Sequence, residues 1–488
     1  MKNLKVLFLF FLISSLVTSC FKDNDDKLIS VSEINDFVWK GMNSWYNWQT
    51  QVPDLADSKK DNSNNYDAYL KQFQKPEDLF NSVIYQKDVI DRFSWFIDDY
   101  IIQEQQFQGI SKSFGMRFQS VQINSSGDII IYVRYVANNS PASAANIKRG
   151  DIISALNGTL LNTTNFSDLV NTLNNDTVTL SFATENNGIL TPTEDKTITA
   201  TIVYENPVYL SKVFNDINGK KVGYLVYNQF VTSYNDELNA AFATFKSENI
   251  DELILDLRLN GGGSVETSSY LASMIYANAG EGKFADLTFN SKHENENGSY
   301  NFSNTLNVYN TNNKKTGEET INRLSSSIRL YILISGSTAS ASEMIINGLK
   351  PYMPVKLIGT TTYGKNVGSI TLYDSPSTDF QDRASANPNH TNAMQPIVFQ
   401  IFNKNGESDY TQGFVPDIEV KEYEYWNNIL PFGDENEAVL KVALDDIRGY
   451  TTKMVSSKKT QAIKSLTIPS TNKFEREMYI DKGFFTKE

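Results

Sequence analysis

The stretch Gly336-Ser337-Thr338-Ala339-Ser340-Ala341-Ser342-Glu343 begins one residue after the apolar run 330–334, and Lys365 follows it within Thr362-Tyr363-Gly364-Lys365. The apolar run is typical of a buried strand, and the residues after Ser340 favour a helix, so we expect Ser340 at a strand-to-helix junction. Small residues on both sides of Ser340 leave room for a substrate backbone to approach its hydroxyl. A lysine that is desolvated loses its proton at neutral pH, so Lys365 is a candidate base for a serine nucleophile.

Each of these two residues also has a structural interpretation. Ser340 and Glu343 have the spacing of a capping box, in which the serine hydroxyl accepts a hydrogen bond from a helix amide. Lys365 follows Gly364 and the predicted strand 355–359, which also fits an exposed turn lysine. Taken alone, each residue is therefore open to a catalytic and to a structural interpretation.

The chain has only two histidines, His293 and His390. Both lie in polar, loop-forming runs without an apolar strand or helix around them, so we do not expect a Ser-His-Asp triad. The sequence also lacks a cluster of His and Cys at metal-ligand spacing. We therefore expect neither a metal nor another cofactor.

Gly261-Gly262-Gly263 lies between the apolar strand pattern 253–257 and a predicted helix through 271–275. Glycines at a helix N-terminus free several backbone amides, which can hold an anion such as the oxyanion of an acyl-transfer reaction. A flexible turn is the plain alternative. A phosphate cradle is not expected, because the run lacks the Gly-Lys-Ser or Gly-Lys-Thr ending.

Residues 1–19 have the pattern of a secretory signal peptide. Two lysines precede the apolar run 6–13, which is too short to span the ~30 Å of membrane hydrocarbon. Leu16-Val17-Thr18-Ser19-Cys20 resembles a bacterial lipobox, and this resemblance implies cleavage before Cys20 and lipidation of its thiol. A cysteine that is removed with the leader is the alternative. Because Cys20 is the only cysteine, no intramolecular disulfide is expected.

The segment 20–29 is polar, mostly acidic and without periodicity, as in a tether that holds a globular body off a membrane. We expect a protein of the cell envelope that is lipid-anchored on the periplasmic or the outer-membrane surface. The formal net charge is -13, and no cluster of Lys and Arg is apparent. Since phosphate binding needs such clusters, the sequence argues against a nucleic-acid partner.

The chain after the tether can bury large cores and should form several domains, because 40% of the residues are hydrophobic and 12% are aromatic. From 30 to 104, Trp and Phe recur at helical spacing, which predicts a helical N-terminal domain with an aromatic core. A glycan-binding platform built from the same aromatics is the alternative.

From 105 to 205 the pattern changes to short β-rich runs separated by Asn, Gly and Ser turns. Ser140-Pro141-Ala142, Gly150-Asp151-Ile152-Ile153 and Asn157-Gly158 together resemble a PDZ domain. The resemblance implies capture of a peptide carboxyl terminus by strand addition, with the loop of Phe114, Gly115 and Met116 holding the carboxylate and lining a pocket for the last side chain. A glycine that permits a bulge at a strand start is the alternative.

Three motifs that follow this segment in the chain together resemble the carboxyl-terminal processing peptidases, also called tail-specific proteases. They are Leu255-Asp256-Leu257-Arg258-Leu259-Asn260-Gly261-Gly262-Gly263, Ser337-Thr338-Ala339-Ser340-Ala341-Ser342-Glu343 and Tyr363-Gly364-Lys365. The resemblance covers residues 105 to 450 and extends to Gly413-Phe414-Val415-Pro416-Asp417 and Gly433-Asp434-Glu435-Asn436-Glu437.

This resemblance implies that Ser340 is the nucleophile and Lys365 the general base. It also implies an oxyanion hole formed by the amides of Ala341 and of Gly261 or Gly262. The expected fold is a multidomain α+β protein, in which the protease core 206–450 is α/β and of the crotonase and ClpP type. Residues 451–488 are expected to form a polar C-terminal tail.

The sequence departs from the family at one position. The family usually has a glutamine four residues after the lysine to orient its amine, and here Ser369 stands there. We expect Ser369 to take this role with a shorter reach.

The sequence thus predicts a serine endopeptidase that hydrolyses peptide bonds of exported proteins through a Ser-Lys dyad, and whose PDZ domain recognises free carboxyl termini. The alternative is a catalytically inactive, PDZ-containing surface lipoprotein that only binds peptides, for which the only hint is the residue at position 369.

Overall fold

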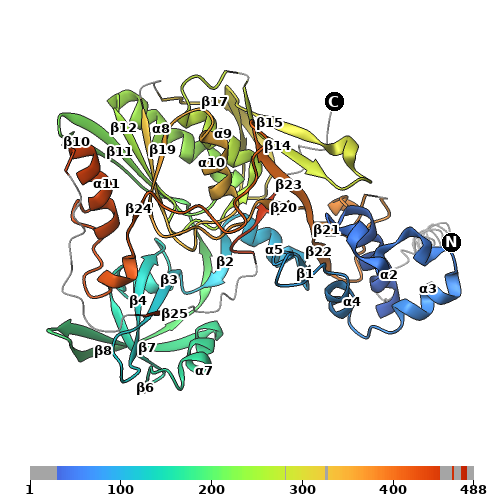
Figure 1. The fold of residues 1–488 in the computed structure, drawn as a ribbon. Coiled ribbons are helices and arrows are strands. Elements are labelled where there is room, and N and C mark those ends of the chain that lie inside the picture. Colours follow the sequence, from blue (N-terminus) through green and yellow to red (C-terminus); the bar gives the residue numbers. More distant parts are fainter. Residues whose placement is uncertain are drawn as a thin grey trace, which may run out of the picture.

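The computed structural model describes residues 30–280, 282–324, 328–377, 379–450, 464–466 and 474–480. They form a helical region (31–107), a β-rich region (110–204) and an α/β core (208–448), shown from blue to red in Figure 1. The expected signal peptide, Cys20 and the acidic tether lie outside the described residues. None of the helices in the described part of the chain combines the length and the apolar character needed to cross a membrane.

The helical region begins at a capping box. The Ser30 hydroxyl accepts a hydrogen bond from Glu33 N, and the Glu33 carboxylate accepts one from Ser30 N. The region comprises α2 (Val31–Trp45), α3 (Ser63–Leu70), α4 (Pro76–Ser82), β1 (Trp95–Ile97) and α5 (Tyr100–Phe107). Strand β1 pairs with β22 (Ala393–Gln395) of the core, so hydrogen bonds of a sheet join the two regions.

The aromatic residues of the helical region are part of its hydrophobic core. Trp39, Trp45 and Tyr46 are each at most 2% exposed. Trp39 packs edge-on against Tyr66, and Tyr46 donates a hydrogen bond to Asp91. The prediction of an aromatic core is confirmed, and these buried rings cannot serve as a glycan-binding platform.

The β-rich region is a sheet with two short helices. Its elements are β2 (Ile110–Ser113), β3 (Met116–Gln122), β4 (Ile129–Val136), α6 (Pro141–Ala144), β5 (Ile152–Leu156), β6 (Thr159–Leu160), α7 (Phe166–Asn171), β7 (Thr177–Asn186), β8 (Ile189–Thr199) and β9 (Thr201–Tyr204). The strands follow the order β3-β4-β5-β7-β8, and β25 (Lys464–Leu466) adds to the outer edge of β3. Every residue of β4 is buried, as expected for a central strand.

The main sheet of the α/β core has the order β10-β11-β12-β18-β19-β24, in which only β10 is antiparallel to its neighbour. Apolar residues that alternate along the strands pack against α8, α9 and α10 on one face and against α11 on the other. The elements are β10 (Val208–Ile217), β11 (Lys220–Tyr227), α8 (Asn235–Glu248), β12 (Glu252–Asp256), α9 (Val265–Ile275), β18 (Arg329–Ile334), α10 (Ala341–Leu349), β19 (Val355–Gly359), β24 (Ile418–Glu419) and α11 (Ala438–Arg448).

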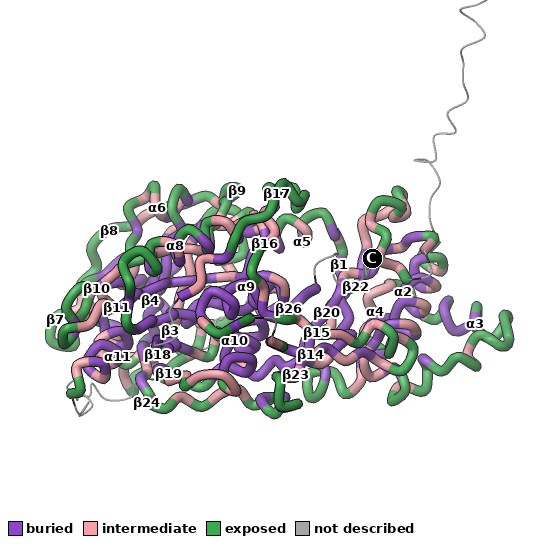
Figure 2. The backbone as a smooth tube through the Cα atoms, turned by 90° about the horizontal axis from the view of Figure 1, so that it is seen from above, coloured by how far each residue is buried: buried purple, intermediate pink, exposed green. Residues whose placement is uncertain are grey.

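A second sheet of the core has the order β13-β26-β20-β23-β14-β15. Its strands are β13 (Gly263–Ser264), β14 (Lys283–Phe289), β15 (Gly298–Asn301), β20 (Val367–Ser369), β23 (Ile397–Asn403) and β26 (Met478–Tyr479). The remaining strands are the hairpin of β16 (Thr305–Tyr309) and the exposed β17 (Lys315–Thr320), and β21 (Leu372–Tyr373), which pairs with β22. Buried residues gather where these layers meet, while β8 and β17 are largely exposed (Figure 2).

The expected polar tail, 451–488, is partly built into the fold. Within its described residues, β25 belongs to the sheet of the β-rich region and β26 to the second sheet of the core. These strands could not be predicted from the polar composition of the tail. Each is only two or three residues long, and its partner strands come from distant parts of the chain.

Candidate active site

Ser340 lies at the turn between β18 and α10. Its backbone has φ 63° and ψ -119°, a conformation that a residue with a side chain rarely adopts. The residue is fully buried, and its Oγ has no hydrogen-bond partner among the described residues. A serine in a strained strand-to-helix turn with a free hydroxyl is the arrangement of a nucleophile.

Glu343 connects the Ser340 turn to the segment that carries Lys365. Its carboxylate accepts hydrogen bonds from Ser340 N at 2.9 Å and from Gly364 N and Lys365 N at 2.8 Å each. Thr362 Oγ1 donates a fourth at 2.5 Å. Burial raises the pKa of Glu343, and these donors act against that rise. The carboxylate half of the expected capping box is thus present, but it positions two segments rather than only starting a helix.

The glycine run packs directly against Ser340. Gly262 has φ +120°, and a Cβ added to it would lie 2.7 Å from Ser340 Cβ and 3.0 Å from Ser340 Oγ. The Asn260 carbonyl accepts hydrogen bonds from Ala339 N and Ser342 Oγ, which fixes the serine turn on the glycine run. Only glycine fits at position 262, since the conformation and the contact both exclude a side chain.

The amides expected to form the oxyanion hole lie in these two turns. Gly262 N donates to Asn260 Oδ1 at 2.9 Å and is therefore engaged in this arrangement. For Gly261 N and Ala341 N, the described part of the chain shows no acceptor. Ala341 is the first residue of α10, where an amide has no partner within the helix.

Lys365 is fully buried, so the interpretation as an exposed turn lysine is wrong. Its Nζ donates hydrogen bonds to Glu477 Oε2 and to the Arg476 carbonyl at 3.0 Å each, and it lies 4.9 Å from the centre of the Phe93 ring. Burial lowers the pKa of Lys365 from its usual range, whereas the neighbouring Glu477 carboxylate opposes this shift. Burial likewise raises the pKa of Glu477, against the effect of Lys365.

Ser369 contacts the lysine's partner rather than the lysine. Its Oγ lies 2.9 Å from Glu477 Oε2, the oxygen that also accepts from Lys365 Nζ. Gln395 Nε2 donates to Ser369 Oγ at 2.9 Å, and Thr371 Oγ1 donates to Gln395 Oε1. A glutamine therefore does reach this position, but from β22 rather than from the segment after the lysine.

Sequence reasoning missed Glu477, Trp95 and Gln395. Trp95 Nε1 donates to Glu477 Oε1 at 3.0 Å, which brings the helical region to the site. Glu477 is separated from Lys365 by 112 positions, and its local sequence carries no motif that would single it out. No signal in the sequence could have found these contacts, since they depend on tertiary pairing alone.

The two histidines have partners away from the serine turn. The His293 ring stacks on Trp45 with 3.5 Å between ring centres, and burial lowers its pKa to about 4. His390 Nε2 lies 2.9 Å from Asp374 Oδ2. Neither therefore serves as the base that a triad would need. Among the described residues there is also no group of His, Cys, Asp and Glu that could hold a metal ion.

In the β-rich region, the loop expected to bind a carboxylate begins β3. Gly115 has φ +72°, and a Cβ added to it would lie 2.1 Å from Ser140 Cβ, so glycine is required there. Phe114 is buried in the core of the region, and the partly buried Met116 packs against that core. Arg117, the next residue, donates hydrogen bonds to the Leu259 carbonyl beside the glycine run and to Glu205.

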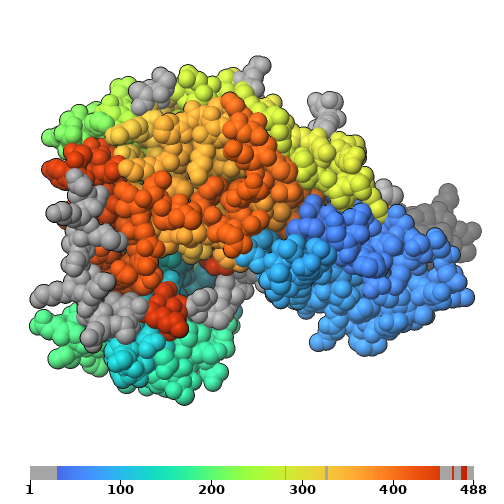
Figure 3. Space-filling model, viewed as in Figure 1, coloured from blue at the N-terminus to red at the C-terminus, as the bar shows by residue number. Residues whose placement is uncertain are grey.

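A cavity of about 830 Å³ lies between the β-rich region and the α/β core. Figure 3 shows the molecular surface hollowed between the orange part of the core and the cyan to green β-rich region. Residues of both regions and of the tail line the cavity, among them Phe114, Met116, Ser337, Ser465 and Arg476. The predicted peptide-binding loop and Ser337, three residues before Ser340, thus open onto one space.

Comparison with protein families gives three matches. Residues 33–95 match the Peptidase S41 N-terminal domain, residues 104–182 the PDZ domain, and residues 221–420 peptidase family S41. A relative assigned as a CtpA-like serine protease in Staphylococcus aureus (strain bovine RF122 / ET3-1) is 22% identical over 433 residues, which cover 84% of this chain and 78% of the relative.

Two further proteins are similar to this chain. A carboxyl-terminal-processing protease of Picosynechococcus sp. (strain ATCC 27264 / PCC 7002 / PR-6) is 22% identical over 284 residues, which cover 55% of this chain and 59% of the relative. A crystal structure assigned to the S41 proteases, from Bacteroides fragilis NCTC 9343, matches with a TM-score of 0.64 and 26% identity over 85% of this chain and 97% of that chain. This chain is therefore an S41 peptidase in which an S41 N-terminal domain and a PDZ domain precede the catalytic domain, in agreement with the predicted multidomain fold.

Proposed function

We propose that this S41 peptidase is a serine endopeptidase whose nucleophile is Ser340 and whose general base is Lys365. One observation carries the assignment: the strained, buried Ser340 has a free hydroxyl, and Glu343 joins its turn to the backbone of a fully buried lysine. Burial favours the neutral amine that a base requires.

The reaction is acyl transfer. Neutral Lys365 takes the proton of Ser340 Oγ while this oxygen attacks a peptide carbonyl, and the new oxyanion accepts hydrogen bonds from the amides of Ala341 and Gly261. Gly262, without a side chain, leaves room for the tetrahedral carbon beside Ser340. Lys365 then gives the proton to the leaving amine. Water, deprotonated by the same amine, releases the acyl group and restores the serine.

Ser369 and Gln395 are assigned a positioning role. Gln395 holds the Ser369 hydroxyl on the carboxylate oxygen of Glu477 that also binds Lys365, so Ser369 and Gln395 act on the amine through Glu477. This pair takes the place of the single glutamine expected for the family.

The PDZ domain is proposed to hold the substrate by its free carboxyl terminus, with Phe114, Gly115 and Met116 at the carboxylate. The support is the position of this loop on the same cavity as Ser337 of the catalytic turn. A bound chain could thus be retained at one end while an internal bond lies at Ser340.

Hydrolysis of one unstructured polypeptide in two forms tests this function. The form with a free carboxyl terminus should be cleaved at internal bonds, and its KM should be at least about tenfold lower than that of the amidated form, which lacks the charge that the loop amides bind. Product masses and initial rates give both quantities. Equal KM values would contradict the role of the PDZ loop, and binding without hydrolysis of either form would favour the inactive alternative.

We further propose that the protein is lipid-anchored at Cys20 in the cell envelope, with exported proteins as its substrates. The support is the leader followed by Leu16-Val17-Thr18-Ser19-Cys20 in the sequence. Cys20→Ala should move the protein from the membrane fraction to the soluble fraction of cells, because one lipid chain or more then no longer attaches. Immunoblots of the two fractions measure this, and an unchanged distribution would contradict the anchor.

A further inference from the structure

The chain's own residues 474–480 lie in the groove beside Ser340. Strand β26 pairs in parallel with β13 on one side and with β20 on the other, so it fills the space between the glycine run and the segment after Lys365. Gly263 N donates to the Glu477 carbonyl at 2.7 Å, and a Cβ at Gly261 would lie 1.9 Å from the Glu475 carbonyl oxygen. Strand β26 in this position has the contacts of a peptide bound by strand addition.

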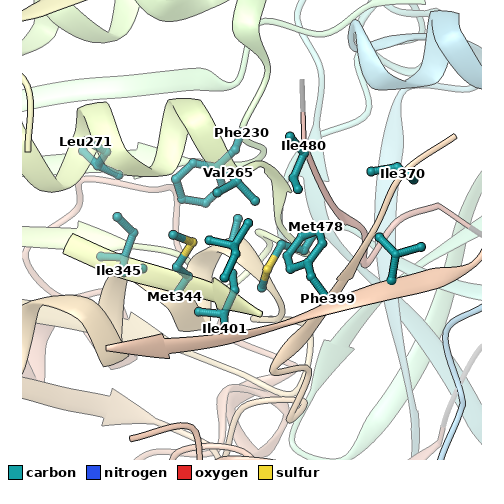
Figure 4. Packing of buried hydrophobic residues seen from close by; sticks show 14 of the residues in the cluster. Phe230, Val265, Leu271, Met344, Ile345, Ile370, Phe399, Ile401, Met478 and Ile480 are labelled. Atoms are coloured by element: carbon teal, nitrogen blue, oxygen red, sulfur yellow. The ribbon is translucent and has the colours of Figure 1, made fainter. Parts of the chain in front are cut away.

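Side chains fix this segment in place. Met478 is fully buried among Val265, Met344 and Phe399, as Figure 4 shows. The Tyr479 ring stacks on Phe107 of the helical region with 4.0 Å between ring centres. The groove therefore includes an apolar pocket next to the catalytic turn, and a methionine of the same chain fills it.

A second piece of the tail occupies the edge of the PDZ domain. Strand β25 pairs antiparallel with β3, with Ser465 opposite Val121 and Leu466 opposite Ser120. Strand β3 follows the loop of Gly115, and its outer edge is where a PDZ domain adds a peptide strand. Leu466 packs against the core of the domain.

We propose that residues 464–466 and 474–480 are an intramolecular ligand of both peptide-binding surfaces, and that a substrate must displace them. This inference rests on the proposed function of Ser340 and Lys365. The occupant of the groove is the chain's own tail, and substrates enter as extended strands with an unbranched apolar side chain in the Met478 pocket.

Three observations show a ligand that is bound but not positioned for cleavage. Lys365 Nζ donates to the Arg476 carbonyl, so the base binds the segment instead of the serine. The Glu477 carboxylate holds the same amine. Ser340 Oγ contacts no acceptor in the described part of the tail. The bound segment therefore blocks the site and is not itself attacked.

Kinetics of full-length variants test the proposal. Met478→Asp places a carboxylate in the apolar pocket and should expel β26, and Glu477→Gln removes the ion pair to Lys365 without changing the shape of the side chain. A tethered ligand at millimolar effective concentration and ~0.1 mM intrinsic affinity raises the apparent KM roughly tenfold. We therefore expect KM for casein to fall about tenfold in Met478→Asp with kcat unchanged, and a synthetic peptide of residues 474–480 to inhibit this variant competitively.

Glu477→Gln should also change the pH dependence of kcat/KM, an effect that loss of structure would not produce. Lys365 is faced by the carboxylates of Glu477 from the tail, Glu343 from α10 and Asp91 from the helical region, all of which raise its pKa. Removing one of them lowers the pKa of Lys365, so the neutral base persists to lower pH. The acid limb of kcat/KM should then shift to lower pH. The control is Glu248→Gln, an exposed carboxylate paired with Lys221, which should leave the limb unchanged.

Hydrogen exchange gives a test that does not need turnover. In Ser340→Ala, an excess of casein should accelerate exchange of the amides of Met478 and Tyr479 if substrate displaces the tail. Unchanged exchange with casein bound would overturn the proposal. If KM in both tail variants equals that of the wild type while Ser340-dependent turnover is present, the tail proposal fails and the proposed function stands. If no variant shows Ser340-dependent turnover, the proposed function fails, and the exchange experiment still decides on the tail.

Discussion

Ser340→Ala and Lys365→Ala will each lower the kcat for casein by at least roughly 10³-fold, because in the proposed mechanism loss of either the nucleophile or its base removes the acyl-transfer pathway. Lys365→Arg should be equally inactive. A guanidinium keeps the positive charge and the hydrogen bonds, but it does not lose a proton in a protein, so it cannot act as the base. Release of new amino groups over time measures all three variants.

The controls are Lys246→Ala and Ser247→Ala on the exposed face of α8, which should retain wild-type turnover. Circular dichroism must show that the catalytic variants are folded, since Lys365 is buried. Retention of more than a tenth of the wild-type kcat by Lys365→Ala would show that another group is the base. An inert wild type that still binds peptides through its PDZ domain would favour the alternative of a peptide-binding lipoprotein.

Much of the candidate site can be predicted from local sequence, because the serine turn and the glycine run are short and their geometry demands particular residues. The serine turn and the glycine run each follow an apolar strand whose neighbours are parallel, so their carboxyl ends meet at one edge of the sheet. Gly115 is identifiable for a similar reason, since its positive φ favours glycine at that one position. These features depend on a few adjacent positions.

The burial and the contacts of Lys365 cannot be predicted from local sequence. A lysine after a glycine has the same local pattern whether it is exposed or buried, and here the helical region and the tail cover it with Phe93 and Glu477. Gln395 reaches Ser369 across 26 positions through the pairing of strands. Which side chains contact Lys365 and Ser369 depends on how strands from the C-terminal part of the chain pair in the sheets. A two-residue strand such as β26 has no periodicity that the sequence could reveal.

The interface between the PDZ domain and the catalytic domain contains a buried cluster of three arginines and three carboxylates. Arg258, three residues before Gly261, pairs with Asp256 at 2.7 Å and with Glu437 at 2.9 Å. Glu422 also pairs with Arg258 and binds two arginines of the PDZ domain, Arg134 and Arg149. The carboxylates raise the pKa of Arg258 further above its usual range, so the guanidinium stays charged despite its burial. The two domains are thus joined through the residue that leads into the glycine run.

Arg258→Ala should lower the free energy of unfolding by about 3–5 kcal/mol, because it leaves buried carboxylates in excess over the arginines that remain. The matched control is Arg329→Ala. Arg329 is half exposed, and its partner Glu252 still pairs with Lys220 in the variant. The free energy of unfolding should therefore fall by about 1 kcal/mol or less. Urea denaturation followed by both tryptophan fluorescence and circular dichroism measures the two values and shows whether the domains unfold together. An equal decrease in the free energy of unfolding for the two variants would mean that the cluster is hydrated in solution. It would also mean that the PDZ domain is not held to the catalytic domain through Arg258.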